Sequence, residues 1–172
     1  RHGLPTLAAS LDDDASLAAA FARASVVLNA AGPFRETALP VARAAIAAGA
    51  GYVDVSGEVD ALMALSGLDG SAKAAGVPLI GAAGYGVAAG ECLALHTAAR
   101  VEGPRRLRLG LDTYVGQRSA GAVQSTVAAL RRGNYEIVGG QPAPAGFADR
   151  PWTVDLDGER FLFAGAPLAE AW

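Results

Sequence analysis

The stretch Ser25-Val26-Val27-Leu28-Asn29-Ala30-Ala31-Gly32-Pro33-Phe34 passes from a short apolar run into a turn of small residues. The run is rich in β-branched residues, which favours a buried β-strand. Apolar residues at helical spacing follow between Thr37 and Gly49. The sequence therefore predicts a strand, a turn and a helix in that order, which is the first half of a βαβ unit.

Two more apolar runs follow in the first half of the chain, Tyr52-Val53-Asp54-Val55 and Val77-Pro78-Leu79-Ile80-Gly81. Alanine-rich stretches of helical character separate the runs. Strands that alternate with helices in this way pair in parallel, because the chain crosses over through each helix before it forms the next strand. We therefore predict an α/β fold with a parallel sheet covered by helices.

Local signals also predict where the helices begin and end. Asp14 is the expected N-cap of the first helix, and Thr37 is the expected N-cap of the second, which Gly49 ends. A third helical stretch begins at Val59, is interrupted by glycines and ends before Gly76.

The hydrophobic period changes after Gly103-Pro104. Arginines alternate with leucines over residues 106–111, which predicts a strand with one wet and one dry face. Antiparallel pairing is expected in this second region, which is a different arrangement from the first. The expected elements are a helix from Ser119 to Arg132, strands over 135–138 and 152–155, a loop from Gly139 to Pro151, and a hairpin turn at Asp157-Gly158.

Composition excludes several classes of protein. The chain has 172 residues, of which 52% are hydrophobic and 18% are charged, so it has enough apolar surface to form a core and is not a disordered chain. The formal net charge is −3, and lysine and arginine are scattered along the sequence. This distribution gives no basic footprint, and we expect no nucleic-acid partner.

The single cysteine, Cys92, excludes an internal disulfide framework and a cysteine-based zinc cluster. We interpret it as a small buried residue in a protein of a reducing compartment, with the cytoplasm as the expected location. The two histidines, His2 and His96, do not stand at metal-ligand spacing, and we expect no metal site. The charge-free run from Ala74 to Gly90 holds five glycines and Pro78, so we expect no membrane span.

Three small-residue motifs follow the predicted strands. The first, Asn29 to Phe34, comes directly after the first strand. In an open parallel sheet, ligands bind outside the carboxyl ends of the strands, and small residues allow a cofactor to approach the backbone. An ordinary strand-to-helix turn has the same pattern, so both interpretations stay open.

The second motif, Asp54-Val55-Ser56-Gly57-Glu58, follows the second strand. Its two carboxylates and its hydroxyl are suited to binding ribose hydroxyls or to acid–base chemistry. The alternative is that Ser56 caps the next helix and Glu58 lies in its first turn. The third motif, Gly84-Tyr85-Gly86-Val87-Ala88-Ala89, has the layout of a dinucleotide-binding fingerprint. The same glycines also suit a hinge into another domain.

Taken together, these segments resemble the saccharopine dehydrogenase-like NAD(P)-binding oxidoreductases, a family that includes the trans-acting enoyl reductases. The resemblance covers about the first 95 residues. It rests on Val26 to Phe34, Ala44 to Gly49, Tyr52 to Glu58, Ala72 to Leu79, Gly84 to Gly86 and Glu91 to Ala94. A looser similarity lies in Ser119 to Ser125, where Ala122 stands in place of the threonine that is usual in the family.

The resemblance implies a Rossmann-like parallel sheet over residues 1–86 that lacks its first strands. Part of an α+β second domain with antiparallel strands follows over residues 87–172, for substrate binding or dimerisation. The implied cofactor is NADP or NAD, and the implied reaction is hydride transfer to or from a carbonyl, imine or enoyl substrate. The family's pyrophosphate loop would precede Arg1, so we expect this chain alone to be inactive. Its exposed sheet edge is expected to associate with the missing N-terminal segment or with another copy.

The resemblance also implies roles for single residues. Glu58 and Tyr85 are the expected catalytic residues that handle protons, and the segment at Gly84 becomes the exit of the last Rossmann strand. One alternative is a non-catalytic binding or regulatory module that retains the fold, and another takes Gly84 to Ala89 as the true pyrophosphate turn. The expected cofactor contacts are Asn29, Ala31, Gly32, Pro33, Phe34, Ser56 and Gly57.

Overall fold

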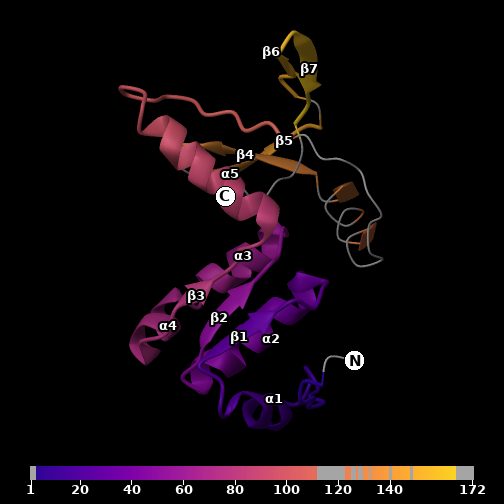
Figure 1. The fold of residues 1–172 in the computed structure, drawn as a ribbon, viewed down its shortest axis with the longest axis vertical. Helices are drawn as coiled ribbons and strands as arrows, with labels where there is room; N and C mark the ends of the chain where they lie inside the picture. Colours follow the sequence, from indigo (N-terminus) through magenta and orange to yellow (C-terminus); the bar gives the residue numbers. More distant parts are fainter. Residues whose placement is uncertain are drawn as a thin grey trace. The chain divides into compact units, whose positions relative to one another are not determined.

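A computed structural model of the chain describes residues 3–111, 123–124, 127, 130–131, 133–139, 141–147 and 149–165. The chain divides into two units (Figure 1). The first comprises Arg1–Ser56 and Asp60–Gly84, and the second comprises Gly57–Val59 and Tyr85–Trp172. The first unit holds a parallel sheet, and the second holds antiparallel strand pairs.

The sheet of the first unit has three strands in the order β1-β2-β3. The strands are β1 (Val26–Asn29), β2 (Gly51–Asp54) and β3 (Leu79–Ile80), and both pairings are parallel. The register places Val27 beside Tyr52 and Asn29 beside Asp54. The predicted fold class is confirmed: a Rossmann-like parallel sheet with helices, followed by antiparallel strands.

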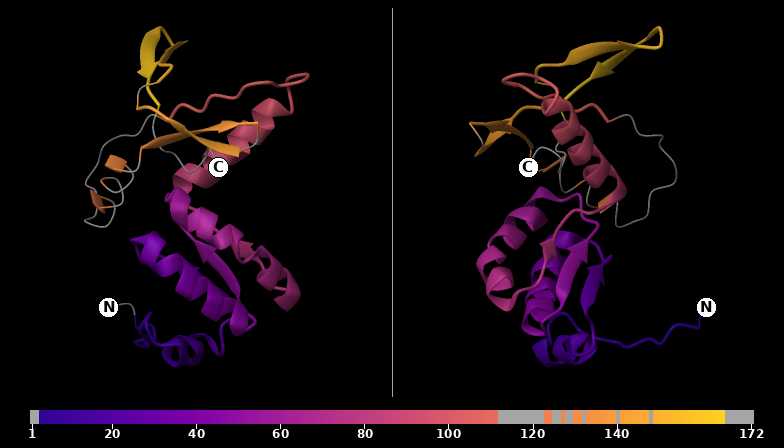
Figure 2. Two further views of the ribbon diagram at one scale, coloured as in Figure 1. Left: turned by 180° about the vertical axis from the view of Figure 1, so that it is seen from behind. Right: turned by 60° about the vertical axis from the view of Figure 1, so that its left-hand side comes forward.

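Helices precede and connect the strands of this sheet (Figure 2). The helix α1 (Asp14–Phe21) comes before β1, and α2 (Phe34–Ala47) joins β1 to β2. A pair of short helices, α3 (Val59–Ser66) and α4 (Asp69–Ala75), joins β2 to β3. The third helical stretch was predicted to be interrupted, and this prediction is confirmed.

The two faces of the sheet differ in burial. Val27 and Tyr52, on one face, belong to a core that residues of α2 and α3 complete. Within the described part of the chain, the residues that point the other way remain open: Val26 is 56% exposed, Leu28 62% and Ile80 48%. The helix side of the core is lined by alanines, and their small methyl groups let the helices approach the sheet closely.

Two predicted helix starts are wrong by a few residues. Asp13, not Asp14, caps α1, and its Oδ1 accepts hydrogen bonds from two backbone amides of the first turn at 3.0 and 3.2 Å. The helix α2 begins after Pro33, so Thr37 lies inside the helix and is buried. Pro33 is the N-cap and has the extended backbone (φ −77°, ψ 132°) that is usual at this position. The Thr37 hydroxyl donates instead to the Ala31 carbonyl.

The predicted helix ends are confirmed. Gly49 has φ +70° and its amide donates to Ile46 O at 3.0 Å, while the Ala50 amide donates to Ala45 O at 2.9 Å. This pair of bonds is a Schellman motif, which glycine completes without strain because it adopts a positive φ readily. Gly76 ends α4 in the same left-handed conformation, with φ +68°.

The second unit begins with α5 (Tyr85–Ala98) and continues with two antiparallel strand pairs. The first pair is β4 (Asn134–Val138) with β5 (Gln141–Ala145), and the second is β6 (Trp152–Leu156) with β7 (Glu159–Phe163). Both turn residues of the second pair, Asp157 and Gly158, have positive φ. This is the type I′ geometry that the Asp-Gly signal predicts, and the hairpin is confirmed.

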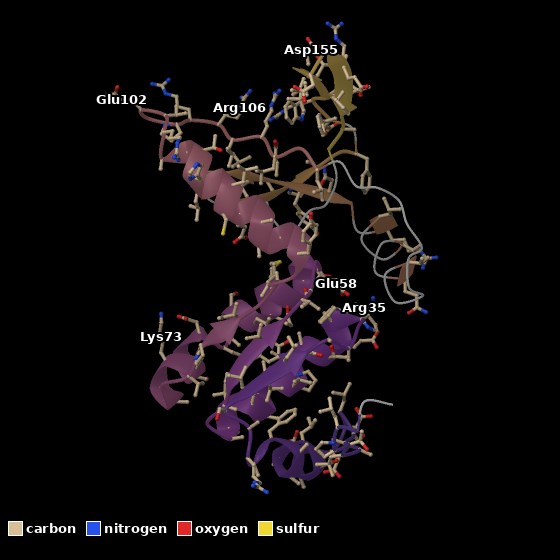
Figure 3. All side chains as sticks on the ribbon, in the orientation of Figure 1. Arg35, Glu58, Lys73, Glu102, Arg106 and Asp155 are labelled. Carbon is tan, nitrogen blue, oxygen red and sulfur yellow. The ribbon has the colours of Figure 1, made fainter. Side chains whose placement is uncertain are left out.

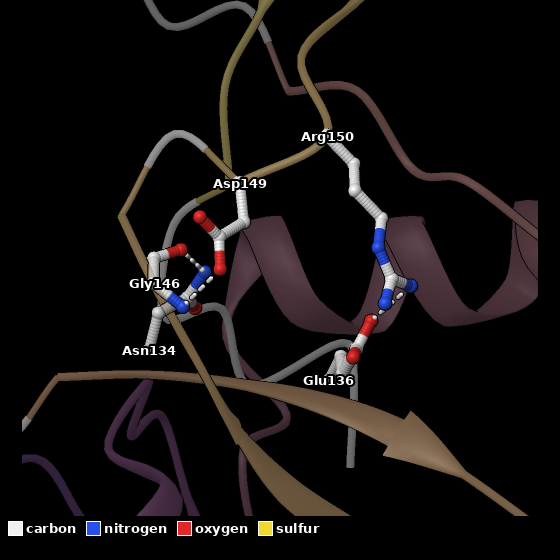
Figure 4. Close-up of polar contacts among 5 residues, drawn as sticks. All are labelled: Asn134, Glu136, Gly146, Asp149 and Arg150. Carbon is white, nitrogen blue, oxygen red and sulfur yellow. Dashed lines mark hydrogen bonds and ion pairs between the residues drawn. The ribbon is translucent and has the colours of Figure 1, made fainter.

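The strand β5 contradicts the predicted loop over Gly139 to Pro151. Pro142 and Pro144 lie within this strand, although a proline has no amide proton to donate to a ladder. The two prolines are two residues apart, so both of their ring nitrogens face the same edge of the strand. The residues that alternate with them keep the ladder to β4. The return from β5 is fixed by polar contacts: the Gly146 amide donates to Asp149 at 2.6 Å, and Arg150 pairs with Glu136 on β4 at 2.9 Å (Figure 4).

Three other expectations for the second unit have different outcomes. Residues 106–111 form no strand, and no described segment pairs with them. The alternation of arginines and leucines defines two faces of a strand, but it does not supply a partner strand. The predicted helix over 119–132 lies mostly outside the described residues, as does most of the Ser119 to Ser125 segment. Its described residues, which include Val123 and Leu130, are helical. Cys92 was predicted to be buried and is exposed on α5.

Candidate functional site

The carboxyl ends of all three parallel strands meet at one edge of the sheet. Asn29 ends β1 beside Asp54 at the end of β2. The segment after β3 is tied to the same place, because the amide of Ala82 donates to Asp54 Oδ1 at 2.7 Å and the amide of Ala83 donates to Asp54 O at 2.8 Å. Ligands of open parallel sheets bind at such an edge.

The β1–α2 loop is anchored at Ala31 on both of its backbone groups. Asn29 Oδ1 accepts a hydrogen bond from the Ala31 amide at 3.1 Å, and the hydroxyl of Thr37 donates to the Ala31 carbonyl at 2.6 Å. Asn29 and Thr37 are buried, whereas Ala31 and Gly32 are exposed. The loop therefore presents a fixed backbone to solvent, and the following Gly32–Pro33 peptide is cis.

Gly32 has open space where a side chain would be. A Cβ there would come no nearer than 3.7 Å to its closest neighbour, the Phe34 ring. The fold itself therefore places no steric demand for glycine at this position. Gly84 is different, since its Cβ would lie 3.0 Å from the carbonyl oxygen of Val55. A cofactor that approaches the β1–α2 loop has room at Gly32, and the residues present fit such a ligand.

Asp54 uses its carboxylate inside the protein. It is fully buried, and Oδ1 accepts from the amides of Ser56 at 2.9 Å and Ala82 at 2.7 Å. Its Oδ2 accepts from the hydroxyl of Tyr52 at 2.8 Å. The side chain that we considered for ribose binding or acid–base work therefore holds loops in place. Ser56 is also fully buried.

Tyr52 and Thr37 belong to this site and were missed by sequence reasoning. Tyr52 lies between Asn29, whose Nδ2 donates to Tyr52 Oη at 3.2 Å, and Asp54. Burial raises the pKa of Tyr52 above its ordinary value; the hydrogen bond from Asn29 lowers it, and the carboxylate of Asp54 raises it further. The sequence carried one signal, because Tyr52 and Asp54 are two apart on a strand and must share a face.

The other candidate residues follow the strand-tip segments in the chain. Gly57 is exposed, and a Cβ there would meet no heavy atom within 4 Å. Glu58 comes next, is partly exposed, and directly precedes α3 (Figure 3). Tyr85 is the first residue of α5 and is 94% exposed. In the β1–α2 loop, Pro33 and Phe34 are partly buried.

The described residues hold neither a candidate metal cluster nor a candidate membrane span. In this part of the chain, histidine, cysteine and carboxylate side chains form no group of three that could hold a metal ion. None of the helices described here is long and apolar enough to cross a membrane.

A parallel sheet whose strand ends meet beside a small-residue loop defines a nucleotide-binding domain of the Rossmann type. In a comparison with protein families, residues 3–80 match the model of the saccharopine dehydrogenase NADP binding domain. The resemblance predicted from the sequence is confirmed over this segment, which ends with β3, and NADP or NAD is the cofactor that it supports. The match supports an NAD(P)-dependent oxidoreductase in general. No curated protein matches the chain.

Proposed function

We propose that the protein is an NAD(P)-dependent oxidoreductase that transfers hydride to or from a carbonyl, imine or enoyl substrate. The observation that carries the proposal is the edge where the ends of β1 and β2 meet, within residues 3–80, which match an NADP binding domain. NADP(H) would supply or accept the hydride, and the protein would supply position and electrostatics.

The cofactor contacts divide into two groups by burial. Ala31, Gly32 and Gly57 are exposed and present backbone, so with Pro33 and Phe34 they would line the nicotinamide half of the site. Asn29 and Ser56 are buried, so their side chains would fix the loops from behind. This division follows the chemistry of close approach, in which small residues touch the ligand and buried polar groups hold them.

Glu58 and Tyr85 are the proposed proton-handling residues. Reduction of a carbonyl or imine needs a proton as well as a hydride, and carboxyl and phenol groups both serve as general acids. Glu58 is partly exposed and Tyr85 is exposed, so solvent reaches both side chains. Substitution Glu58→Gln or Tyr85→Phe is expected to lower kcat while leaving the Kd for NADP unchanged.

The direct test is a fluorescence titration of the full-length protein with NADPH, NADH and their oxidised forms. Gly32→Ala is the most informative variant. The protein alone has room for the added methyl group, but the methyl group would occupy space that a bound cofactor needs. We expect its Kd for NADP to rise at least about tenfold. Gly70→Ala in α4 is the matched control, since a Cβ there also meets no heavy atom within 4 Å. Wild-type protein that binds neither dinucleotide would overturn the proposal, and equal affinities of the Gly32→Ala and wild-type proteins would remove Gly32 from the site.

We further propose a homo-oligomer in the cytoplasm. The support for assembly is the open apolar face of the sheet, because parallel sheets are normally covered on both faces. The support for a reducing compartment is Cys92, an exposed free thiol.

A further inference from the structure

The buried polar side chains at the strand ends form a continuous chain of hydrogen bonds. It starts at the Ala31 amide, which donates to Asn29 Oδ1 at 3.1 Å, and continues from Asn29 Nδ2 to Tyr52 Oη at 3.2 Å. Tyr52 Oη donates to Asp54 Oδ2 at 2.8 Å, and Asp54 Oδ1 accepts from the Ala82 amide at 2.7 Å. We call Asn29, Thr37, Tyr52 and Asp54 the strand-tip network.

The carboxylate at one end fixes the direction of every bond in this network. A carboxylate only accepts, so Tyr52 donates to Asp54 and is left to accept from Asn29. The amide nitrogen of Asn29 must then face Tyr52, and its oxygen must face the Ala31 amide. The second proton of Asn29 Nδ2 goes to Thr37 Oγ1 at 3.1 Å, so the network is satisfied throughout.

Both ends of the network hold loop backbone in a defined conformation. At one end Ala31 is gripped on its amide and its carbonyl. At the other end Ala82 has φ +56°, a conformation that costs an alanine energy and persists where its surroundings impose it. Ala82 is buried, and Asp54 holds this segment through two hydrogen bonds, from the Ala82 amide to Oδ1 and from the Ala83 amide to the backbone oxygen.

We propose that Tyr52 is a positioning residue that couples the β1–α2 loop to the β3–α5 segment. Among the side-chain hydrogen bonds of the described residues, those of its hydroxyl join the Asn29 half to the Asp54 half of the strand-tip network. A shift of Ala31 therefore reaches Ala82 through Tyr52, and the reverse also holds. The consequence for a nicotinamide dinucleotide rests on the proposed function: a ligand that contacts Ala31 and Gly32 would bind a loop that Tyr52 holds ready.

The coupling is tested in the free protein by residue-specific amide hydrogen exchange. Thr37→Val removes the hydroxyl that holds Ala31 but touches nothing on the Asp54 side. We expect the Ala82 amide to exchange about fivefold faster in this variant, and less than about twofold faster when Tyr52→Phe is already present. Thr37→Ser keeps the hydroxyl and is the matched control. The Ala72 amide, which donates to Leu68 O at 2.9 Å in α4, is the reference against which both changes are corrected.

Equal acceleration of Ala82 with and without the Tyr52 hydroxyl would overturn the coupling, and so would no acceleration at all. If Thr37→Val fails to fold, Tyr52→Phe alone decides: it must accelerate both Ala31 and Ala82 beyond Ala72. An NADP titration then separates the two proposals. Tyr52→Phe is expected to raise the Kd about tenfold and Tyr135→Phe, a tyrosine of β4, to leave it unchanged. Wild-type protein without dinucleotide affinity contradicts the proposed function, while the exchange result still decides the coupling.

Discussion

Tyr52 is one of the largest fully buried side chains of the described part of the chain, and its proton has a thermodynamic consequence. Burial raises its pKa, so the folded protein holds the proton more tightly than the unfolded chain does. Below about pH 10, the ordinary value for tyrosine, both states are protonated and the stabilisation is fully present. At higher pH the unfolded chain loses its proton first, so stability falls by up to about 1.4 kcal/mol per pH unit.

Urea unfolding of the wild-type and Tyr52→Phe proteins from about pH 8 to about pH 11 measures this effect. We expect the stability advantage of the wild-type protein to be constant below about pH 10 and to shrink above it. Tyr135→Phe, which removes a phenol hydroxyl from β4, is the control for the loss of a tyrosine hydroxyl elsewhere in the chain. Parallel curves for the wild-type and Tyr52→Phe proteins would show that the Tyr52 proton is not linked to folding.

At the residue scale, the sequence predicted position better than role. It placed Asp54 and Ser56 at the carboxyl end of the second strand, and in the structure Asp54 is the last residue of β2. It did not show that both side chains are buried. Whether such a side chain is buried depends on the way it points, since a carboxylate at a strand end faces either solvent or the neighbouring loops. Only the neighbouring strands and loops determine which, and Ala82, the partner of Asp54, is far away in the sequence.

At the scale of elements, the cap of α1 gives a prediction with a built-in control. Asp13 accepts two hydrogen bonds from the first turn, whereas Asp14 contributes only a charge near the helix N-terminus. Asp13→Ala is expected to lower the free energy of unfolding by about 1 kcal/mol. Asp13→Asn and Asp14→Ala should each cost clearly less, as measured by urea unfolding. If Asp14→Ala is the more harmful change, the cap lies one residue further on, as the sequence alone predicted.

Elements that depend on local signals were predicted well, and elements that depend on distant partners were not. Gly49 and Gly76 end helices because positive φ is a local property, and the Asp157-Gly158 hairpin follows from its own turn residues. The strand β5 was missed because prolines fit a strand only when their nitrogens are not needed for its ladder. That condition depends on the pairing with β4, which is distant information for a local pattern. Residues 106–111 show the opposite error, in which a strand pattern has no described partner.

At the scale of the whole molecule, the open face of the parallel sheet predicts association. Val26, Leu28 and Ile80 present an apolar surface that would normally be covered. We expect light scattering to give a particle larger than the 17.3 kDa of one chain. Leu28→Thr should shift the population toward single chains, whereas Leu95→Thr, at an exposed leucine of α5, should not. A monodisperse particle of 17.3 kDa would contradict association through this face.

The resemblance to the saccharopine dehydrogenase NADP binding domain could be predicted from the sequence because several motifs have the order and spacing of that family. Its match covers residues 3–80, which includes the whole parallel sheet. The second half of the sequence supports the resemblance less, since Ser119 to Ser125 is only loosely similar to the family. This segment also lies mostly outside the described residues. Substrate choice depends on side chains that no general motif specifies, so the sequence predicts the cofactor class more firmly than the substrate.

The alanines that line the core set a limit on how this protein can vary. Ala42, Ala45 and Ala50 have no exposed surface, and Ala38 has almost none, so a larger side chain at any of them would force α2 away from the strands. Such a shift would carry Pro33 and the rest of the β1–α2 loop with it, because the loop continues directly into that helix. Divergence toward new substrates therefore has little freedom in the layer beneath the site and must be accommodated in the segments that project beyond the strand ends.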